Sequence, residues 1–308
     1  MTNPFYLRDV VSIKDFGREE LEYLFEQADR FLEMGYEEKS KYGRGKLMAL
    51  MFFEPSTRTK TSFEAAMLSI GGHVIGFSEA RGTSMEKGES LSDTIRVMDR
   101  YADVLVIRNP MEGAARYAAE LAEHPVINAG SGSEEHPTQA LLDLFTIRRL
   151  KGGIDGLRVA VVGDLKYGRT VYSLLNALKL YSVEVYLVSP PQLRIREEAL
   201  YDLKGMKIHL DVELDEALKL ADVIYVTRIQ RERFPHPEEY EKVKGSYKID
   251  ARAMRLVKED AILLHPLPRV GEIAPEVDGF GQAKYFEQVR LGRYLRETLL
   301  ALILNENP

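Results

Sequence analysis

The sequence contains neither cysteine nor tryptophan in its 308 residues. Without cysteine the chain cannot form disulfides, use a thiolate nucleophile or bind a metal through sulfur, and this composition fits the cytoplasm. No apolar run reaches the roughly 18–20 residues that a membrane span needs. The first residues lack the basic and apolar regions of a signal peptide, so we expect no membrane association.

The chain also lacks an excess of positive charge, since 48 acidic residues outnumber 42 basic ones and the formal net charge is −6. An acidic chain is a poor general binder of nucleic acid. Any anionic ligand must then be held by local clusters of arginine and lysine. Among the 6 histidines no two have metal-ligand spacing with a carboxylate partner, so we expect no metal and no other cofactor.

One short stretch combines a strand, a turn and a helix start. Residues 46–52 form an apolar run of strand length, and Phe63, Met67 and Ile70 then follow helical spacing. Ser56 between them is a candidate N-cap, which places residues 57–59 in the first helical turn. Free N–H groups, hydroxyls and an arginine at such a helix start suit a phosphate. The alternative is an ordinary capped helix whose arginine faces water.

The rest of the chain alternates strand and helix patterns, which predicts an α/β fold with doubly wound parallel sheets. We expect two such domains joined by interdomain helices at 136–150 and 284–304, with residues 1–134 plus 288–308 in one domain and residues 135–287 in the other. A further helix is expected over residues 17–34, with Asp15 as its cap. The segment 78–89 shows neither period, and the segment 230–247 is polar and rich in proline and charge, so both are predicted to be long loops. The expected strands are 46–52, 73–77, 103–107, 125–129, 159–162, 183–188, 208–210, 223–226 and 261–264.

Ligands of doubly wound sheets bind outside the carboxyl ends of the strands. Arginine stands at five of the six informative strand ends of this acidic chain. A single arginine is more often a solvated surface residue, but five at corresponding positions predict a strongly anionic ligand set. These strand ends carry residues 56–59, Arg108, His136 with Gln139, Arg169 with Thr170, Arg228 with Gln230, and residues 265–269.

Two of these strand ends allow another interpretation. Residues 163–170 have the glycine spacing of a nucleotide-binding P-loop, but Arg169 replaces the lysine and no acidic Mg²⁺ ligand can be placed. A tight strand-to-helix turn that presents Arg169 to a cleft is better supported. His136 alone would be read as a structural histidine at a helix start, but Gln139 one turn on favours a role as a neutral donor.

The residues at these strand ends resemble the aspartate/ornithine carbamoyltransferase family, and its aspartate-using branch in particular. The match covers about residues 5–300 in family order. The motifs that carry it are Phe53–Thr59 with Ser62–Glu64, His136–Asp143, Gly163-Asp164 with Gly168–Thr170, Val226–Gln230, and His265–Arg269.

The resemblance implies transfer of the carbamoyl group of carbamoyl phosphate to L-aspartate, in pyrimidine synthesis. It assigns aspartate to Lys87, Arg169, Arg228 and Gln230, and catalysis to Arg58, Thr59, Arg108, His136 and Lys87. Carbamoyl phosphate is assigned to Ser56, Thr57, Arg58, Thr59, Arg108, His136, Gln139, Leu267 and Pro268. We further predict that Glu54 pairs with Arg169 or Arg233 and holds a closed form.

The resemblance also bears on assembly. Lys87 matches a lysine that reaches a neighbouring subunit's site, which implies a homotrimer with shared active sites and leaves regulatory chains, and with them an allosteric assembly, open. The loop from Ser84 to Lys87 is shorter than the family pattern, so Ser84 stays unassigned.

Two rivals remain. An ornithine carbamoyltransferase would not be expected to offer Arg169 and Arg228 together, and it places a cysteine where this chain has Pro266. A nucleotide-binding protein of the P-loop kind is the more distant alternative.

Overall fold

The computed structural model describes residues 2–231, 234 and 236–308. The chain forms two compact units, residues 1–142 with 290–308, and residues 143–289. Each unit contains one all-parallel sheet, which confirms the predicted fold class. The division falls within two helices, α6 (Pro137–Lys151) and α12 (Tyr285–Leu304), so each helix contributes residues to both units.

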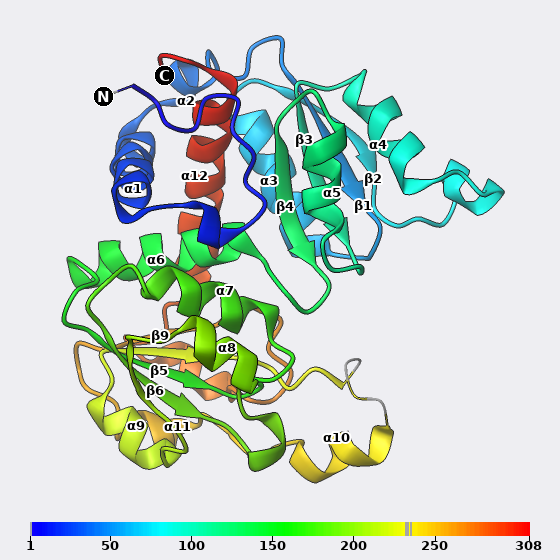
Figure 1. Ribbon diagram of the computed structural model, residues 1–308. Helices are drawn as coiled ribbons and strands as arrows, with labels where there is room; N and C mark the ends of the chain where they lie inside the picture. The colour runs from blue at the N-terminus through cyan, green and yellow to red at the C-terminus, as the bar shows by residue number, and fades with distance from the viewer. Residues whose placement is uncertain (1, 232–233, 235) are drawn as a thin grey trace. The chain divides into compact units, whose positions relative to one another are not determined.

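The first unit is built on four strands in the order β2-β1-β3-β4 (Figure 1). Five of the six residues of β1 are buried, as expected for an apolar strand covered on both faces. The chain moves from β1 outward to β2 and then crosses to β3, so the strand order reverses between β1 and β3. The strands are β1 (Leu47–Phe52), β2 (His73–Phe77), β3 (Val104–Asn109) and β4 (Val126–Ser131). The helices that lie wholly in this unit are α1 (Arg18–Glu33), α2 (Tyr36–Lys39), α3 (Thr57–Ser69), α4 (Leu91–Asp99) and α5 (Ala114–Leu121).

The second unit has five strands in the order β7-β6-β5-β8-β9. Its order reverses between β5 and β8, so this pair of strand ends is where a ligand crevice is expected. The strands are β5 (Arg158–Val162), β6 (Glu184–Val188), β7 (Lys207–His209), β8 (Val223–Val226) and β9 (Ile262–Leu264). The helices are α7 (Arg169–Leu178), α8 (Glu197–Asp202), α9 (Leu214–Leu220), α10 (Pro237–Val243) and α11 (Ala251–Met254).

Two local predictions were wrong. Helix α1 is capped by Gly17, whose N–H donates to Glu20 at 2.8 Å, while Asp15 ends a preceding 3-10 turn. The segment 230–247, predicted to be a loop, contains helix α10. Proline is a loop signal in many sequences, but here it stands at the first helical position, where its missing N–H costs no hydrogen bond.

A buried ion pair fastens the C-terminal helix to the first unit. Lys39 Nζ lies 3.1 Å from Glu297 Oε2, and both side chains are buried. The ammonium also stands 4.2 Å from the centre of the Tyr294 ring. Arg293 Nε lies 3.2 Å from the other carboxylate oxygen of Glu297. Glu297 is therefore the shared anion of two cations.

We expect Glu297→Gln to lower the free energy of unfolding by about 3–5 kcal/mol, because it leaves the Lys39 ammonium buried without its anion. Lys39→Met should cost less, since Glu297 keeps Arg293. Chemical denaturation measures both. The exposed pair Arg100–Glu123 is the control, and Arg100→Met should leave the stability nearly unchanged. A larger loss for Lys39→Met than for Glu297→Gln would contradict this assignment.

Candidate active site

The start of α3 stands at the reversal point of the first sheet. Ser56 occupies the N-cap position as predicted, but its side chain accepts no hydrogen bond from the first helical turn. Thr57 and Arg58 are exposed, and Thr59 is half-buried. The helix start thus presents hydroxyls and a guanidinium at its positive end, which suits an anion.

Arg108 joins three strand ends at the same edge. It is the register partner of Phe52 on β1, and its carbonyl accepts the N–H of Phe53 at 2.8 Å. Its Nη1 donates to the carbonyl of Ala129 on β4 at 3.2 Å. Its Nε lies 2.8 Å from Glu54 Oε1. The structure therefore brings Arg108 together with the turn that precedes α3.

Glu54 pairs with a cation of its own unit. The predicted partners differ from this one: Arg169 belongs to the second unit, and Arg233 lies outside the described residues. The observed partner, Arg108, is the neighbour that strand register places beside the turn. A pairing of Glu54 with Arg169 or Arg233 stays a prediction.

His136 and Gln139 follow β4 on a firmly held turn. Both side chains are at least nine-tenths buried. The neighbouring carboxylate of Glu135 accepts hydrogen bonds from Ser12 Oγ at 2.6 Å and from the N–H of Ile13 at 2.9 Å. Burial raises the pKa of Glu135, and these hydrogen bonds only partly offset that effect. Sequence patterns gave no signal for Glu135, because its partner Ser12 is far away in the chain.

Lys87 ends the 3-10 turn η2 (Ser84–Lys87), which lies in the segment predicted to be a loop. The turn is capped by Thr83, and the next residue, Gly88, has a left-handed φ of 96°. The side chain of Lys87 is exposed.

In the second unit, Gly163 and Thr227 hold the ends of β5 and β8 close together. Gly163 has a φ of +120°, and a Cβ added there would stand 2.3 Å from the carbonyl oxygen of Thr227. Thr227 Oγ1 in turn accepts the N–H of Asp164 at 3.1 Å. Arg228 follows Thr227 directly, so this contact fixes where the arginine leaves the sheet.

Asp164 organises the turn that leads to Arg169. Its buried carboxylate accepts the N–H groups of Lys166 at 3.1 Å and Tyr167 at 2.9 Å. Burial raises the pKa of Asp164, although hydrogen bonds from Tyr167, Gln230 and Lys166 oppose it. A P-loop would offer such N–H groups to a phosphate. Here an internal carboxylate uses them, which disfavours the nucleotide-binding alternative.

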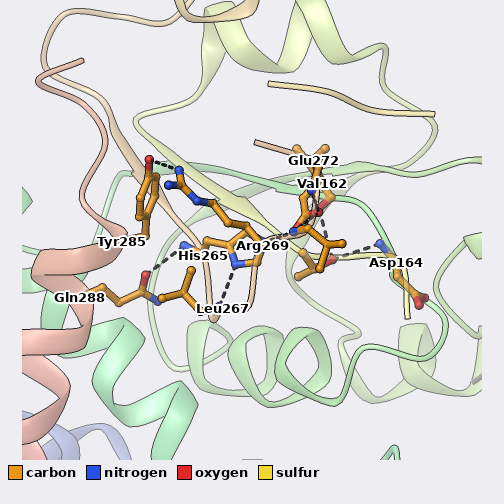
Figure 2. Close-up of polar contacts among 11 residues, drawn as sticks. Val162, Asp164, His265, Leu267, Arg269, Glu272, Tyr285 and Gln288 are labelled. Carbon is orange, nitrogen blue, oxygen red and sulfur yellow. Dashed lines mark hydrogen bonds and ion pairs between the residues drawn. The ribbon is translucent and has the colours of Figure 1, made fainter. Parts of the chain in front are cut away.

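The turn after β9 is held through both nitrogens of a buried histidine (Figure 2). His265 Nδ1 accepts the N–H of Leu267 at 2.8 Å, so the ring proton sits on Nε2, which lies 2.7 Å from Glu272 Oε1. The N–H of His265 donates to Gln288 Oε1 at 3.0 Å, and Gln288 Nε2 donates to Asp143 Oδ1 at 2.6 Å. The backbone of Leu267 is thereby fixed.

Arg269, the fifth strand-end arginine, is engaged elsewhere. Its Nη2 donates to Asp278 Oδ2 at 2.6 Å, and its Nη1 donates to the hydroxyl of Tyr285 at 2.8 Å. These contacts raise the pKa of Arg269. Arg269 therefore stabilises the turn and does not extend the anion-binding site.

His265 gives the protein a predicted pH dependence. Burial lowers the pKa of His265 below 6.5, despite its bond to Glu272, so the unfolded chain binds the proton more readily. The stability linked to His265 is then complete above about pH 6.5 and is lost as the pH falls through the folded pKa. We expect the difference in Tm between the wild type and His265→Asn to shrink from pH 8 to pH 5. A constant or widening difference would contradict this.

Comparison with known proteins agrees with this geometry. Residues 8–149 match the model of the aspartate/ornithine carbamoyltransferase carbamoyl-P binding domain, and residues 155–303 match that of the Asp/Orn binding domain. The chain belongs to the aspartate/ornithine carbamoyltransferase family. The two matches confirm the resemblance that the motifs of this carbamoyltransferase indicate.

Named relatives cover almost the whole chain. The aspartate carbamoyltransferase catalytic subunit of Thermococcus gammatolerans is 56% identical over 300 residues, which is 96% of this chain and 97% of the relative. The M. jannaschii aspartate transcarbamoylase catalytic subunit superimposes with a TM-score of 0.89 at 49% identity, covering 97% of this chain and 99% of that one. The Trypanosoma cruzi aspartate transcarbamoylase, solved with carbamoyl phosphate and aspartate, gives 0.92 at 39% identity and covers 98% of each chain.

Among the described residues of this carbamoyltransferase, no group of three or more histidine, aspartate or glutamate side chains could hold a metal ion. No helix within the same residues is long and apolar enough to cross a membrane.

Proposed function

We propose that this carbamoyltransferase moves the carbamoyl group of carbamoyl phosphate to the amine of L-aspartate, giving N-carbamoyl-L-aspartate and phosphate. The observation that carries the aspartate assignment is the pair of arginines, Arg169 and Arg228, at the reversal point of the second sheet. Two guanidinium groups suit a dicarboxylate. They would repel the cationic side chain of ornithine. Pro266, in place of a cysteine, points the same way.

Carbamoyl phosphate is assigned to the first unit and to the turn after β9. Ser56, Thr57, Arg58 and Thr59 hold the phosphate, with Arg108 beside them. His136 and Gln139 contact the carbamoyl group, together with the backbone of Leu267 and Pro268. The helix start and the two arginines offset the charge that develops on the leaving phosphate.

Aspartate is assigned to Arg169, Arg228 and Gln230, with Lys87 from a neighbouring subunit. The amine attacks the carbamoyl carbon as the bond to the phosphate oxygen breaks, and the phosphate takes up the amine proton. The hydroxyl of Thr59 and the imidazole of His136 donate to the developing oxyanion. Holding two reactants in attack geometry lowers the activation free energy by up to roughly 7–11 kcal/mol.

The assembly is part of the proposal. The exposed position of Lys87 on η2 supports a homotrimer in which each site borrows this lysine. Glu54 would exchange Arg108 for Arg169 or Arg233 when the site closes. Regulatory chains, and the allosteric control they would bring, are a further proposed partner. The mass of the purified protein, measured with and without added lysate, tests both the homotrimer and the binding of regulatory chains.

The function is tested by supplying carbamoyl phosphate with either L-aspartate or L-ornithine and measuring the carbamoylated amino acid. We expect product with aspartate and none above background with ornithine. ATP is the control ligand for the P-loop alternative and should not bind. Carbamoylation of ornithine, or ATP binding without carbamoyl transfer, would overturn the proposal.

A further inference from the structure

A buried arginine on α12 joins two helices that carry proposed ligand-binding residues. Arg296 is 5% exposed, and its guanidinium carbon lies 4.9 Å from the centre of the Phe63 ring. Its Nη1 donates to Ser62 Oγ on α3 at 2.8 Å. Its Nη2 donates to Thr138 Oγ1 on α6 at 3.3 Å. One planar group therefore holds both helices within the first unit.

Both hydroxyls stand close to the ligand-binding ends of their helices. Ser62 is three residues after Thr59, so the two lie on the same face of α3, one turn apart. Thr138 lies between His136 and Gln139 and is fully buried. The phosphate end of carbamoyl phosphate is assigned to α3 and its carbamoyl end to the start of α6. The fork of Arg296 thus spans the same two helix starts as the ligand.

We propose that Arg296 is a positioning residue that sets the spacing between the phosphate-binding start of α3 and the carbamoyl-binding start of α6. The inference rests on the proposed function of those helix starts. A guanidinium is a rigid planar fork, whereas a lysine ammonium is a point charge on a flexible stem. Only the fork fixes two hydroxyls at a set separation. Arg296 touches neither reacting group, so its effect is on ligands that contact both helices.

The test compares two ligands of the full-length protein by calorimetry. Inorganic phosphate contacts the α3 side alone. Phosphonoacetamide, which has CH₂ in place of the bridging oxygen of carbamoyl phosphate, contacts both sides. We expect Arg296→Lys to weaken phosphonoacetamide about tenfold, as for the loss of one charge-assisted hydrogen bond, and phosphate by less than about twofold. KM for carbamoyl phosphate should rise in parallel.

A second arginine of α12 offers a matched control, because it contacts α3 but lies away from the helix start. Arg293 Nη1 donates to Ser69 Oγ at 3.3 Å, at the far end of α3. Arg293→Lys should leave the affinities for both ligands unchanged. Ser62→Ala and Thr138→Val each remove one arm of the fork, and each should weaken phosphonoacetamide more than phosphate. These two variants carry the test if Arg296→Lys fails to fold.

Equal weakening of both ligands, or of neither, in Arg296→Lys and in the two single-arm variants would overturn the proposal. Arg58→Met and His136→Asn separate this result from a failure of the proposed function. If both variants weaken phosphonoacetamide while Arg296→Lys affects the two ligands equally, only the positioning role is wrong. If neither weakens phosphonoacetamide, the assignment of the helix starts is wrong as well.

Discussion

Arg58→Met is expected to lower kcat for carbamoyl transfer by about 100- to 1,000-fold, the usual result of removing one group that stabilises developing charge. Arg58 stands in the first turn of α3, beside a helix start whose N-cap side chain forms no capping bond. As the carbamoyl–phosphate bond breaks, negative charge builds on the leaving oxygen. A methionine fills similar space but offers no donor. Steady-state kinetics at saturating aspartate measure the effect.

The control for Arg58 is Lys60→Met on the same helix. Lys60 forms an ion pair with Glu64 one turn on. Losing this partly exposed pair should cost about 1 kcal/mol or less in stability and leave kcat within about threefold. An equal loss of kcat in the two variants would mean that α3 attracts the substrate only through its overall positive charge. In that case the phosphate would not be bound specifically by Arg58.

Arg228→Met is expected to reduce kcat/KM for aspartate by about 1,000-fold, while binding of phosphonoacetamide changes little. Truncating one partner of a desolvated charge pair costs about 2–5 kcal/mol, and a carboxylate of aspartate would lose its partner. Arg228 leaves β8 at the position fixed by the contact between Thr227 and Gly163. The reduction should therefore affect kcat/KM for aspartate and leave the binding of the carbamoyl-phosphate analogue nearly unchanged.

Arg252→Met is the matched control for Arg228. Arg252 belongs to the same unit, and its side chain is 82% exposed. It should change kcat/KM for aspartate by less than about twofold, because exposed charges are strongly screened. If Arg228→Met weakened phosphonoacetamide as much as it weakened aspartate, the assignment of Arg228 to aspartate would be wrong.

The strands were predictable because buried parallel strands are nearly continuous apolar runs. Residues 46–52 and 223–226 show this, and they become β1 and β8. The locations of the arginines followed from the same regularity, since parallel strands end at one edge of the sheet. The strand order, and with it the two reversal points, could not be derived from strand patterns alone. Order depends on long-range packing.

The sequence could not reveal the groups that support the site. Arg296 contacts Ser62, which is 234 residues away in the chain, and no local pattern links them. The pair that Glu54 forms with Arg108 was not foreseen either, because it depends on the register between β1 and β3. Asp164 stood in a recognised motif, yet its bonds to Lys166 and Tyr167 depend on the turn geometry.

We expect Gly163 to be necessary for activity although it carries no reactive group. A single methyl group added there would collide with the carbonyl of Thr227 and would also disfavour the left-handed backbone. The collision would push apart the two chain segments that deliver Arg169 and Arg228. In the proposed site, aspartate would then meet both cations at the wrong separation, although every charge remained. A mutational survey confined to charged and polar side chains would miss this cause of inactivity.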